Sequence, residues 1–152
     1  EQMYGDKVEV QEGEYIFPIG VAEIKRQGTD VTIVSFGKII KEAYKAADEL
    51  EKEGVSCEII DLRTVRPLDI DAIITSVKKT NRLVILEEAW PFGNISTEIT
   101  YQVQAKAFDY LDAPVARINT ADTPAPYSPV LLAEWLPNSN DVIDAVKKVM
   151  YK

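Results

Sequence analysis

Two adjacent carboxylates, Glu87 and Glu88, are the side chains best suited by type and spacing to acid–base chemistry. Two acids in one cleft can be driven to different pKa values, so that one gives a proton while the other takes one. The pair directly follows the apolar run 83–86, and charges at strand ends are usually paired or solvated. If the strands 55–62 and 83–86 are neighbours in a sheet, Arg63 or Arg66 can lie beside Glu87 or Glu88. We therefore expect a structural ion pair here in place of a catalytic pair.

A second group of oxygen ligands comprises Asp61, Asp69 and Asp71, and Mg²⁺ prefers such carboxylates. Asp69 directly precedes an apolar helical pattern, where its side chain can accept a hydrogen bond from a free backbone amide. Asp71 falls in the first turn of that helix, which is positive. Helix-end electrostatics explains these aspartates, so we predict no metal site. The expected structural charges at strand ends are then Asp61, Arg63, Arg66, Asp69, Glu87 and Glu88.

The sequence lacks the residues that most nucleophilic and metal-dependent sites need. It contains no histidine and one cysteine, which removes His-dependent triads, Cys/His zinc patterns and a disulfide framework. Cys57 lies in a β-branched run with no histidine to activate it, so we expect a buried structural thiol. Neither phosphate-loop pattern, GxGxxG or GxxxxGK(S/T), is present. Trp90 to Phe92 are expected to be core or interface anchors. These residues predict a domain that acts through its surfaces.

The overall charge favours a basic protein partner. With 17 Lys and Arg against 25 Asp and Glu, the net charge is −8. Nucleic acids and anionic membranes bind clustered cations, which this composition does not favour. No apolar run reaches the roughly 18 to 20 residues of a membrane span, and the N-terminus lacks the order of a signal peptide. The length of 152 residues suits one domain with its own core.

The segment 55–77 shows how the fold positions these charges. A β-branched run at 55–62 ends in charge, Pro67 disfavours helix at Arg66, and apolar residues at helical spacing follow Asp69. Strands and amphipathic helices alternate in this way along the chain, which predicts a mostly parallel sheet covered on both faces. The expected strands are 21–26, 31–36, 55–62, 83–86 and 115–118. The expected helices are 38–53, 70–77, 96–108, 130–135 and 142–150, the last capped by Ser139, Asn140 or Asp141.

Four motifs in fixed order resemble one family. They are Cys57–Asp69 (CEIIDLRTVRPLD), Ser76–Glu88 (SVKKTNRLVILEE), Tyr110–Pro114 (YLDAP) and Ala121–Tyr127 (ADTPAPY). In this order they resemble the C-terminal domain of the β subunit of the pyruvate dehydrogenase E1 component, within the transketolase-like thiamine diphosphate enzymes. The resemblance covers essentially the whole chain. It implies an α/β fold, a three-layer α/β/α domain whose five-stranded, mostly parallel sheet has an antiparallel first strand.

The resemblance also implies where the chemistry takes place. In the family a thiamine-binding domain precedes this one in the β subunit, so residues 1–20 are expected to be a linker from that missing domain and residues 21–152 the transketolase C-terminal-like domain. The catalytic residues and most contacts to thiamine diphosphate and Mg²⁺ are expected there or in the α subunit. We expect no catalytic, cofactor or metal residue in this chain and no activity from it alone. The family reaction is oxidative decarboxylation of pyruvate with acetyl transfer to lipoyl-E2, in the bacterial cytoplasm or the mitochondrial matrix.

The implied partners are the E1 α subunit, a second E1 β subunit and the small basic subunit-binding domain of E2, with no nucleic acid and no membrane. Asp112 matches the aspartate of the family's LDAP motif, and Lys152 supplies the chain-terminal carboxylate. Both are acceptors suited to Lys and Arg side chains of E2. Two alternatives stay open: the β-subunit domain of a branched-chain 2-oxoacid dehydrogenase, and a stand-alone α/β binding module.

Overall fold

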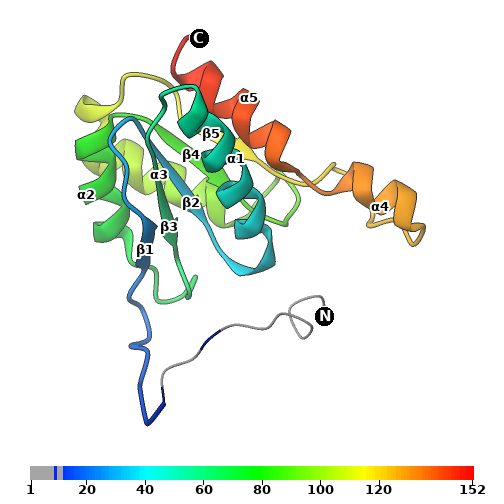
Figure 1. Cartoon of the computed structure of the whole chain (residues 1–152), viewed down its shortest axis with the longest axis horizontal. Helices are drawn as coiled ribbons and strands as arrows, with labels where there is room; N and C mark the ends of the chain where they lie inside the picture. The colour runs from blue at the N-terminus through cyan, green and yellow to red at the C-terminus, as the bar shows by residue number, and fades with distance from the viewer. Residues whose placement is uncertain (1–8, 10–11) are drawn as a thin grey trace.

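A five-stranded sheet forms the centre of the computed structural model, which describes residue 9 and residues 12–152 (Figure 1). Its strands are β1 (Glu23–Arg26), β2 (Val31–Ser35), β3 (Cys57–Asp61), β4 (Leu83–Leu86) and β5 (Ala116–Ile118), in the order β1-β3-β2-β4-β5. β1 runs antiparallel to β3, and the other described pairings are parallel. The predicted sheet with an antiparallel first strand is confirmed. Of the expected linker 1–20, residues 1–8 and 10–11 lie outside the described residues.

Helices cover both faces of the sheet and complete the predicted three layers (Figure 1). On one face, α1 (Ile40–Lys52), which follows the 3-10 turn η1 (Gly37–Ile39), packs beside α5 (Ser139–Val149). On the other face lie α2 (Ile70–Thr80) and α3 (Ile95–Ala107), the latter followed by the 3-10 turn η2 (Phe108–Tyr110). The short helix α4 (Pro129–Trp135) projects away from this body (Figure 1).

Alternate residues of β2 explain why the fold has two helical layers. Val31 and Ile33 pack against α1 and α5, whereas Val34 packs against α2 and α3. All five residues of this strand are buried, because a central parallel strand is covered on both faces. Burial of each such aliphatic side chain stabilises the fold by about 1.5–3 kcal/mol.

Side-chain caps determine where two of the helices begin. Asp69 Oδ1 accepts a hydrogen bond (3.1 Å) from the backbone amide three residues on, which confirms the predicted cap of α2. The helix α5 begins earlier than predicted, because Asn138 is its N-cap and accepts from the Asn140 amide (2.8 Å). Asp141 Oδ2 in turn accepts from the Asn138 amide (2.8 Å), which completes a capping box. The prediction of Ser139, Asn140 or Asp141 as the cap was therefore wrong by at least one residue.

A buried polar cluster ties α2 to the amino ends of β2 and β3. Glu58 is almost fully buried and accepts hydrogen bonds from Ser76 (2.5 Å) and from Lys79, both on α2. Thr32 of β2 shares hydrogen bonds with Ser76 (2.6 Å) and with Thr80 (2.7 Å). Because these buried groups have partners, they fix the helix on the sheet without leaving polar atoms unsatisfied.

Candidate functional site

The sheet order separates the charges that follow the strands. β2 lies between β3 and β4, so the arginines after β3 are not beside the glutamates after β4. Arg63 pairs instead with Glu23 on β1, and Arg66 is exposed in the turn that follows β3. The predicted ion pair between these arginines and Glu87 or Glu88 is therefore wrong. The prediction assumed that β3 and β4 are neighbouring strands, whereas β2 lies between them in the sheet.

Arg63 also holds Phe17 of the N-terminal segment against the domain. Its guanidinium carbon lies 4.3 Å from the centroid of the Phe17 ring, which meets the Tyr15 ring edge-on at 5.0 Å between centroids. A hydrogen bond from Lys25, together with the charges of Lys25 and Arg63, holds the pKa of Glu23 below its ordinary value of 4.5. The charges at the end of β3 thus organise residues 15–25.

Glu87 supports the start of α3. Its side chain is fully buried, and its Oε1 accepts hydrogen bonds from the Ser96 amide (3.2 Å) and from Asn119 Nδ2 (2.9 Å). Ser96 is the second residue of α3, where the helix dipole favours a negative charge. The other carboxylate oxygen of Glu87, Oε2, has no hydrogen-bond partner among the residues that the structure describes. Glu87 therefore serves the helix N-terminus, which is a structural role.

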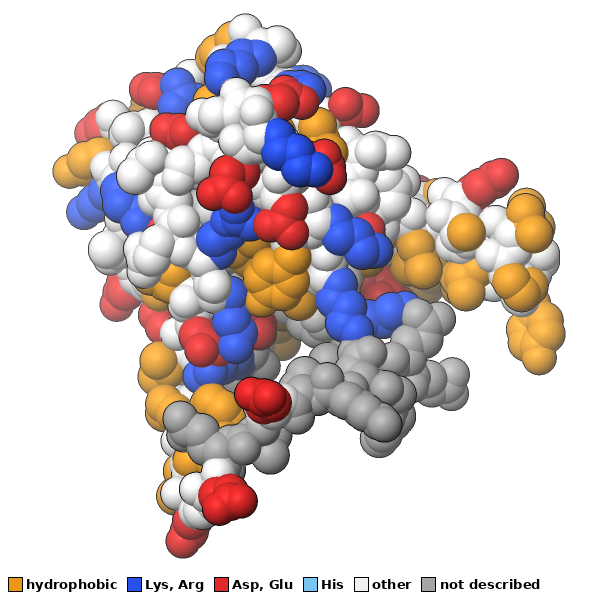
Figure 2. All heavy atoms as spheres, viewed as in Figure 1, with side chains coloured by type: hydrophobic (Ala, Val, Ile, Leu, Met, Phe, Trp, Pro, Cys, Tyr) orange, Lys and Arg blue, Asp and Glu red, His pale blue; other side chains and the backbone are white. Residues whose placement is uncertain are grey.

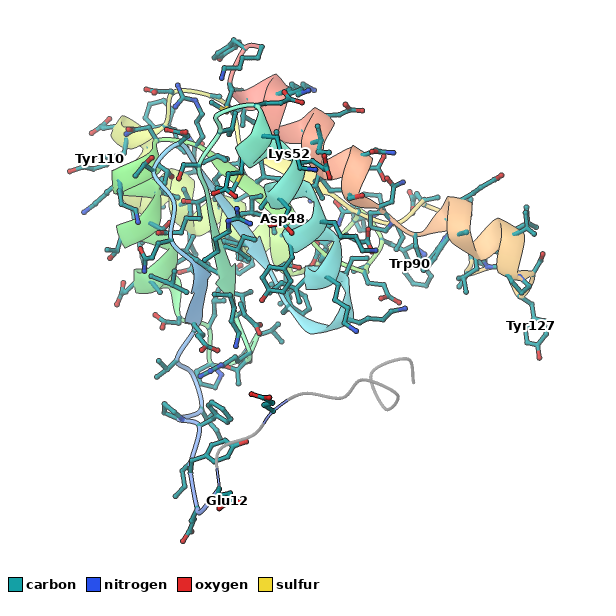
Figure 3. The ribbon with its side chains drawn as sticks, viewed as in Figure 1. Glu12, Asp48, Lys52, Trp90, Tyr110 and Tyr127 are labelled. Atoms are coloured by element: carbon teal, nitrogen blue, oxygen red, sulfur yellow. The ribbon has the colours of Figure 1, made fainter. Side chains whose placement is uncertain are left out.

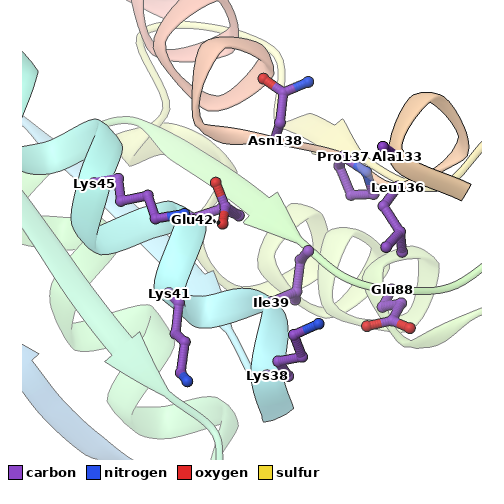
Figure 4. A pocket seen from close by; sticks show the side chains of 10 residues that line it. All are labelled: Lys38, Ile39, Lys41, Glu42, Lys45, Glu88, Ala133, Leu136, Pro137 and Asn138. Atoms are coloured by element: carbon purple, nitrogen blue, oxygen red, sulfur yellow. Dashed lines mark hydrogen bonds and ion pairs between the residues drawn. The ribbon is translucent and has the colours of Figure 1, made fainter. Parts of the chain in front are cut away.

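Glu88 instead borders a hollow of about 470 Å³, which lies between α1 with its preceding turn η1 and the connection from α4 to α5. Figure 4 shows Glu88 and Glu42 on opposite sides of this hollow. Glu42 accepts hydrogen bonds from Lys45 Nζ (2.6 Å) and from the Ser139 amide (3.1 Å), so it joins α1 to α5. Because Glu87 is buried against α3, the two adjacent carboxylates share no cleft, and the structure does not build a catalytic pair. The residues that line the hollow are Lys38, Ile39, Lys41, Glu42, Lys45, Glu88, Ala133, Leu136, Pro137 and Asn138.

The described aspartates and the single cysteine have structural environments. Among the described residues no group of three or more His, Cys, Asp or Glu side chains could hold a metal ion. Asp61 Oδ1 accepts from the Arg63 amide (3.0 Å), and Asp71 lies in the first turn of α2. Cys57 is 1% exposed, and burial raises the pKa of its thiol to about 11. Since the thiolate is the reactive form, this thiol is inert near neutral pH. The predicted burial of Cys57 is confirmed.

Asp112 and the end of the chain lie on one surface. The Asp112 side chain is 54% exposed and pairs with Arg82, with 3.2 Å between Nη2 and Oδ2. The Tyr151 hydroxyl donates to the Asp112 carbonyl oxygen (3.3 Å), and the Lys152 amide donates to the Lys147 carbonyl oxygen (3.0 Å). The end of α5 therefore brings the last residues of the chain beside the segment that precedes β5.

Two apolar hollows flank this segment. One of about 300 Å³ lies between residues 113–116 and the end of α5, and another of about 440 Å³ lies between residues 111–115, α3 and η2. Pro114 lines both of them. We call Asp112, Pro114, Tyr151 and Lys152 the Asp112 surface. A partner that carries a cation beside an apolar side chain matches the acid and the hollows together.

A second surface, which was not predicted from the sequence, is formed by both tryptophans. Trp90 Nε1 and Trp135 Nε1 donate to the same carbonyl oxygen, that of Thr123 (2.9 and 3.0 Å). Trp90 is 53% exposed and Phe92 is 90% exposed, so their expected placement in the core is wrong. Figure 3 shows Trp90 near the base of α4 and Tyr127 at its far end. The alternative expectation, that these aromatic residues are interface anchors, stays a prediction.

Comparison with known sequences decides the family. Residues 20–142 match the family model described as Transketolase, C-terminal domain. The chain belongs to this family. This transketolase C-terminal domain is 50% identical over 153 residues to the pyruvate dehydrogenase E1 component subunit beta of Rhizobium meliloti, covering 100% of this chain and 33% of that protein. It is 46% identical over 139 residues to the mitochondrial E1 component subunit beta of Dictyostelium discoideum, covering 91% of this chain and 39% of that protein.

A solved structure shares the fold of this transketolase C-terminal domain. The chain of a split gene transketolase, described as an inactive beta4 tetramer, is similar with a TM-score of 0.79 and 26% identity, over 95% of this chain and 46% of that chain. The chain thus spans between a third and a half of the length of these relatives. Within the described part of the chain, no helix has the length and apolar character that crossing a bilayer requires.

Proposed function

We propose that this transketolase C-terminal domain belongs to the β subunit of a pyruvate dehydrogenase E1 component. The observation that carries the proposal is similarity to such β subunits across nearly the whole chain, at 46% and 50% identity in a mitochondrial and a bacterial relative. The complete enzyme decarboxylates pyruvate oxidatively and transfers the acetyl group to lipoyl-E2. The role of this domain is to hold the subunits together and to dock E2.

Thiamine diphosphate and Mg²⁺ belong, in this proposal, to other parts of the enzyme. Thiamine diphosphate supplies the centre that stabilises the carbanion left by decarboxylation. The described residues do not fit this group, because they form no metal-binding cluster and the sequence contains no histidine. No step of the reaction is therefore assigned to them. Residues 1–20 are proposed to connect to a thiamine-binding domain, and the family match that begins at residue 20 supports this boundary.

The proposed partners are the E1 α subunit, a second E1 β subunit and the E2 subunit-binding domain. The Asp112 surface supports the E2 assignment. Asp112 is more than half exposed, and among the described residues it forms one ion pair, with Arg82. A guanidinium of E2 can therefore reach the carboxylate. Hydrogen bonds between a cation and a carboxylate are about twice as strong as neutral ones.

Binding of the E2 subunit-binding domain to this chain tests the docking proposal. Replacing Asp112→Lys should weaken binding by about tenfold or more, because an attraction at the interface becomes a repulsion. The affinity of the unchanged chain should also fall as salt rises. Isothermal titration calorimetry measures both effects, and thermal unfolding shows whether the variant is folded.

The matched control for this experiment is Asp109→Lys. Asp109 is exposed on η2, three residues before Asp112, and its replacement changes the net charge by the same amount. The docking proposal expects little loss of affinity from this control. Equal losses from the two variants would show that only net charge matters, and unchanged affinity of the Asp112→Lys variant would reject the site.

A further inference from the structure

The side chain of Arg82, the residue directly before β4, joins three separate parts of the chain. Its Nη2 pairs with Asp112 Oδ2 (3.2 Å), its Nε donates to the Val149 carbonyl oxygen (3.2 Å), and its Nη1 donates to the Asp30 carbonyl oxygen (3.5 Å). Asp30 directly precedes β2, Asp112 lies between η2 and β5, and Val149 is the last residue of α5. The guanidinium therefore connects the ends of elements that are distant in the sequence.

The backbone of Asp112 is held at this place by other residues. Its amide donates to the Asn81 carbonyl oxygen (2.9 Å), and Asn81 Nδ2 donates to the Tyr110 carbonyl oxygen (2.8 Å). The Tyr151 hydroxyl donates to the carbonyl oxygen of Asp112 (3.3 Å). Among the described residues, however, the carboxylate of Asp112 forms one ion pair, with Arg82. The backbone thus fixes where Asp112 lies, and Arg82 fixes where its carboxylate points.

We propose that Arg82 is a positioning residue for docking, because it holds the Asp112 carboxylate in the orientation that a cation of the E2 subunit-binding domain recognises. The inference rests on the proposed docking function and names the residue of this chain that prepares the site. Arg82 contacts Oδ2, which leaves Oδ1 for a cation of the partner. Without Arg82 the exposed carboxylate is free to change rotamer, and ordering it on binding costs affinity.

The positive charge of Arg82 is compensated within the chain. One side of its guanidinium meets the Asp112 carboxylate, and another meets the carbonyl oxygen of Val149, at the negative C-terminal end of α5. Figure 2 shows basic and acidic side chains next to one another around the end of α5, without a block of either sign. A cation of the partner therefore meets little net repulsion from Arg82, and the orientation of the carboxylate decides the affinity.

Net charge and positioning predict opposite results when Arg82 is replaced. Arg82→Gln adds one unit of negative charge to a chain whose net charge is −8, and this change alone strengthens the attraction to a basic partner. Loss of the oriented carboxylate has the opposite effect. We expect the affinity for the E2 subunit-binding domain to fall by about fivefold or more, an ordinary size for the coupling between contacting residues. Isothermal titration calorimetry measures the change.

The matched control for net charge is Lys106→Gln. Lys106 is exposed on α3, where its Nζ donates to Gln102 Oε1 (3.4 Å), and its replacement removes the same charge. This control should bind E2 as tightly as the unchanged chain or slightly more tightly. Arg82→Lys keeps the charge but lacks the guanidinium fork that reaches Asp112 and Val149 together, so its affinity should lie between those of the unchanged chain and Arg82→Gln. Circular dichroism verifies that each variant is folded.

A double-mutant cycle separates positioning from a general effect on the fold. In an Asp112→Asn chain the carboxylate that Arg82 orients is gone, so Arg82→Gln should cause little further loss of affinity. A role confined to the structure of the domain would lower the affinity by the same factor in both backgrounds. That result, or an Arg82→Gln variant that binds at least as tightly as the unchanged chain, would overturn the inference. If Arg82→Gln does not fold, Arg82→Lys in the same two backgrounds gives the decision.

The docking function and the role of Arg82 fail at different measurements. If Asp112→Lys loses affinity whereas Arg82→Gln keeps it, the docking site stands and the role of Arg82 is rejected. If Asp112→Lys keeps its affinity, the docking site itself is rejected, and the role of Arg82 is rejected with it.

Discussion

Cys57 is the only thiol of the chain, and its burial in β3 makes it a probe of the folded state. Burial disfavours the thiolate, and the pKa of the group is accordingly raised to about 11. Below that pH the thiol is protonated, and in the folded chain it is also covered. Its reaction with a disulfide reagent therefore reports how often the sheet opens.

We expect the folded chain at neutral pH to react with Ellman's reagent far more slowly than the chain in denaturant. The physical reason is that both steric cover and the raised pKa suppress attack by the Cys57 sulfur. Absorbance of the released thiolate follows the reaction. A Tyr101→Cys variant supplies an exposed thiol as the control, and similar rates for Cys57 in the folded and denatured chain would contradict the buried position.

Single side chains were predictable from sequence where their partners are local. Asp69 caps the helix that begins beside it, so its role follows from the adjacent residues. The partners of Glu87 lie on α3 and on the segment after β5, and no local pattern names them. Arg117 was not singled out for the same reason, although it donates to the Pro91 carbonyl oxygen (3.2 Å) and steadies the turn after β4.

At the scale of elements, the capping box of α5 links the end of α4 to the core. Asn138 and Asp141 satisfy two backbone amides at the helix N-terminus, and Glu42 of α1 accepts from a third, that of Ser139. The first turn of α5 is therefore held both by its own side chains and by α1. This arrangement sets the point from which α4 projects.

Replacing Asn138→Ala should lower the free energy of unfolding by about 0.5–2 kcal/mol, the usual cost of losing an N-cap side chain. The reason is that the Asn140 amide loses its acceptor at the start of α5. Urea unfolding followed by circular dichroism measures the loss. Asn140→Ala is the control, because the side chain of Asn140 is exposed and is not the cap, and an equal loss from both variants would contradict the assigned capping role.

The order of the strands was the element-scale property that the sequence did not reveal. Hydrophobic patterns located the strands and most of the helices, because these patterns depend on burial along each segment. The pairing of β2 with both β3 and β4 depends on how the connecting helices pack on the sheet. No single position in the sequence indicates this pairing. The exposed apolar face of α4 was missed because a helical apolar pattern normally indicates the core.

At the scale of the whole molecule, the domain presents two different surfaces at its two ends. The Asp112 surface combines an acid with apolar hollows. The surface at the other end is uncharged and apolar, and it is formed by Trp90, Phe92, Tyr127, Val130 and Leu131. The fold class followed from the sequence because strands and helices alternate and because four ordered motifs resemble one family. The two surfaces could not be located in this way, since each is assembled from segments that are distant in the chain.

We expect the chain alone, supplied with pyruvate, thiamine diphosphate and Mg²⁺, to release no carbon dioxide above the buffer rate. The reason is that the proposal places the cofactor site in other parts of the enzyme, and the sequence offers no histidine. Trapping of labelled carbon dioxide from [1-¹⁴C]pyruvate measures the release. A complete pyruvate dehydrogenase E1 in the same assay is the positive control, and turnover proportional to the amount of chain would contradict the assignment.

The shared carbonyl of Thr123 has an optical consequence. The chain contains two tryptophans, and both indole groups donate a hydrogen bond to the Thr123 carbonyl oxygen near α4. Both indole groups lie outside the apolar core. Intrinsic tryptophan emission therefore reports on residues 123–135, which we call the projecting arm, and only indirectly on the sheet. Emission should move to shorter wavelength when another molecule covers the arm. Any gap between the unfolding curves recorded by emission and by circular dichroism measures how independently the arm detaches from the body.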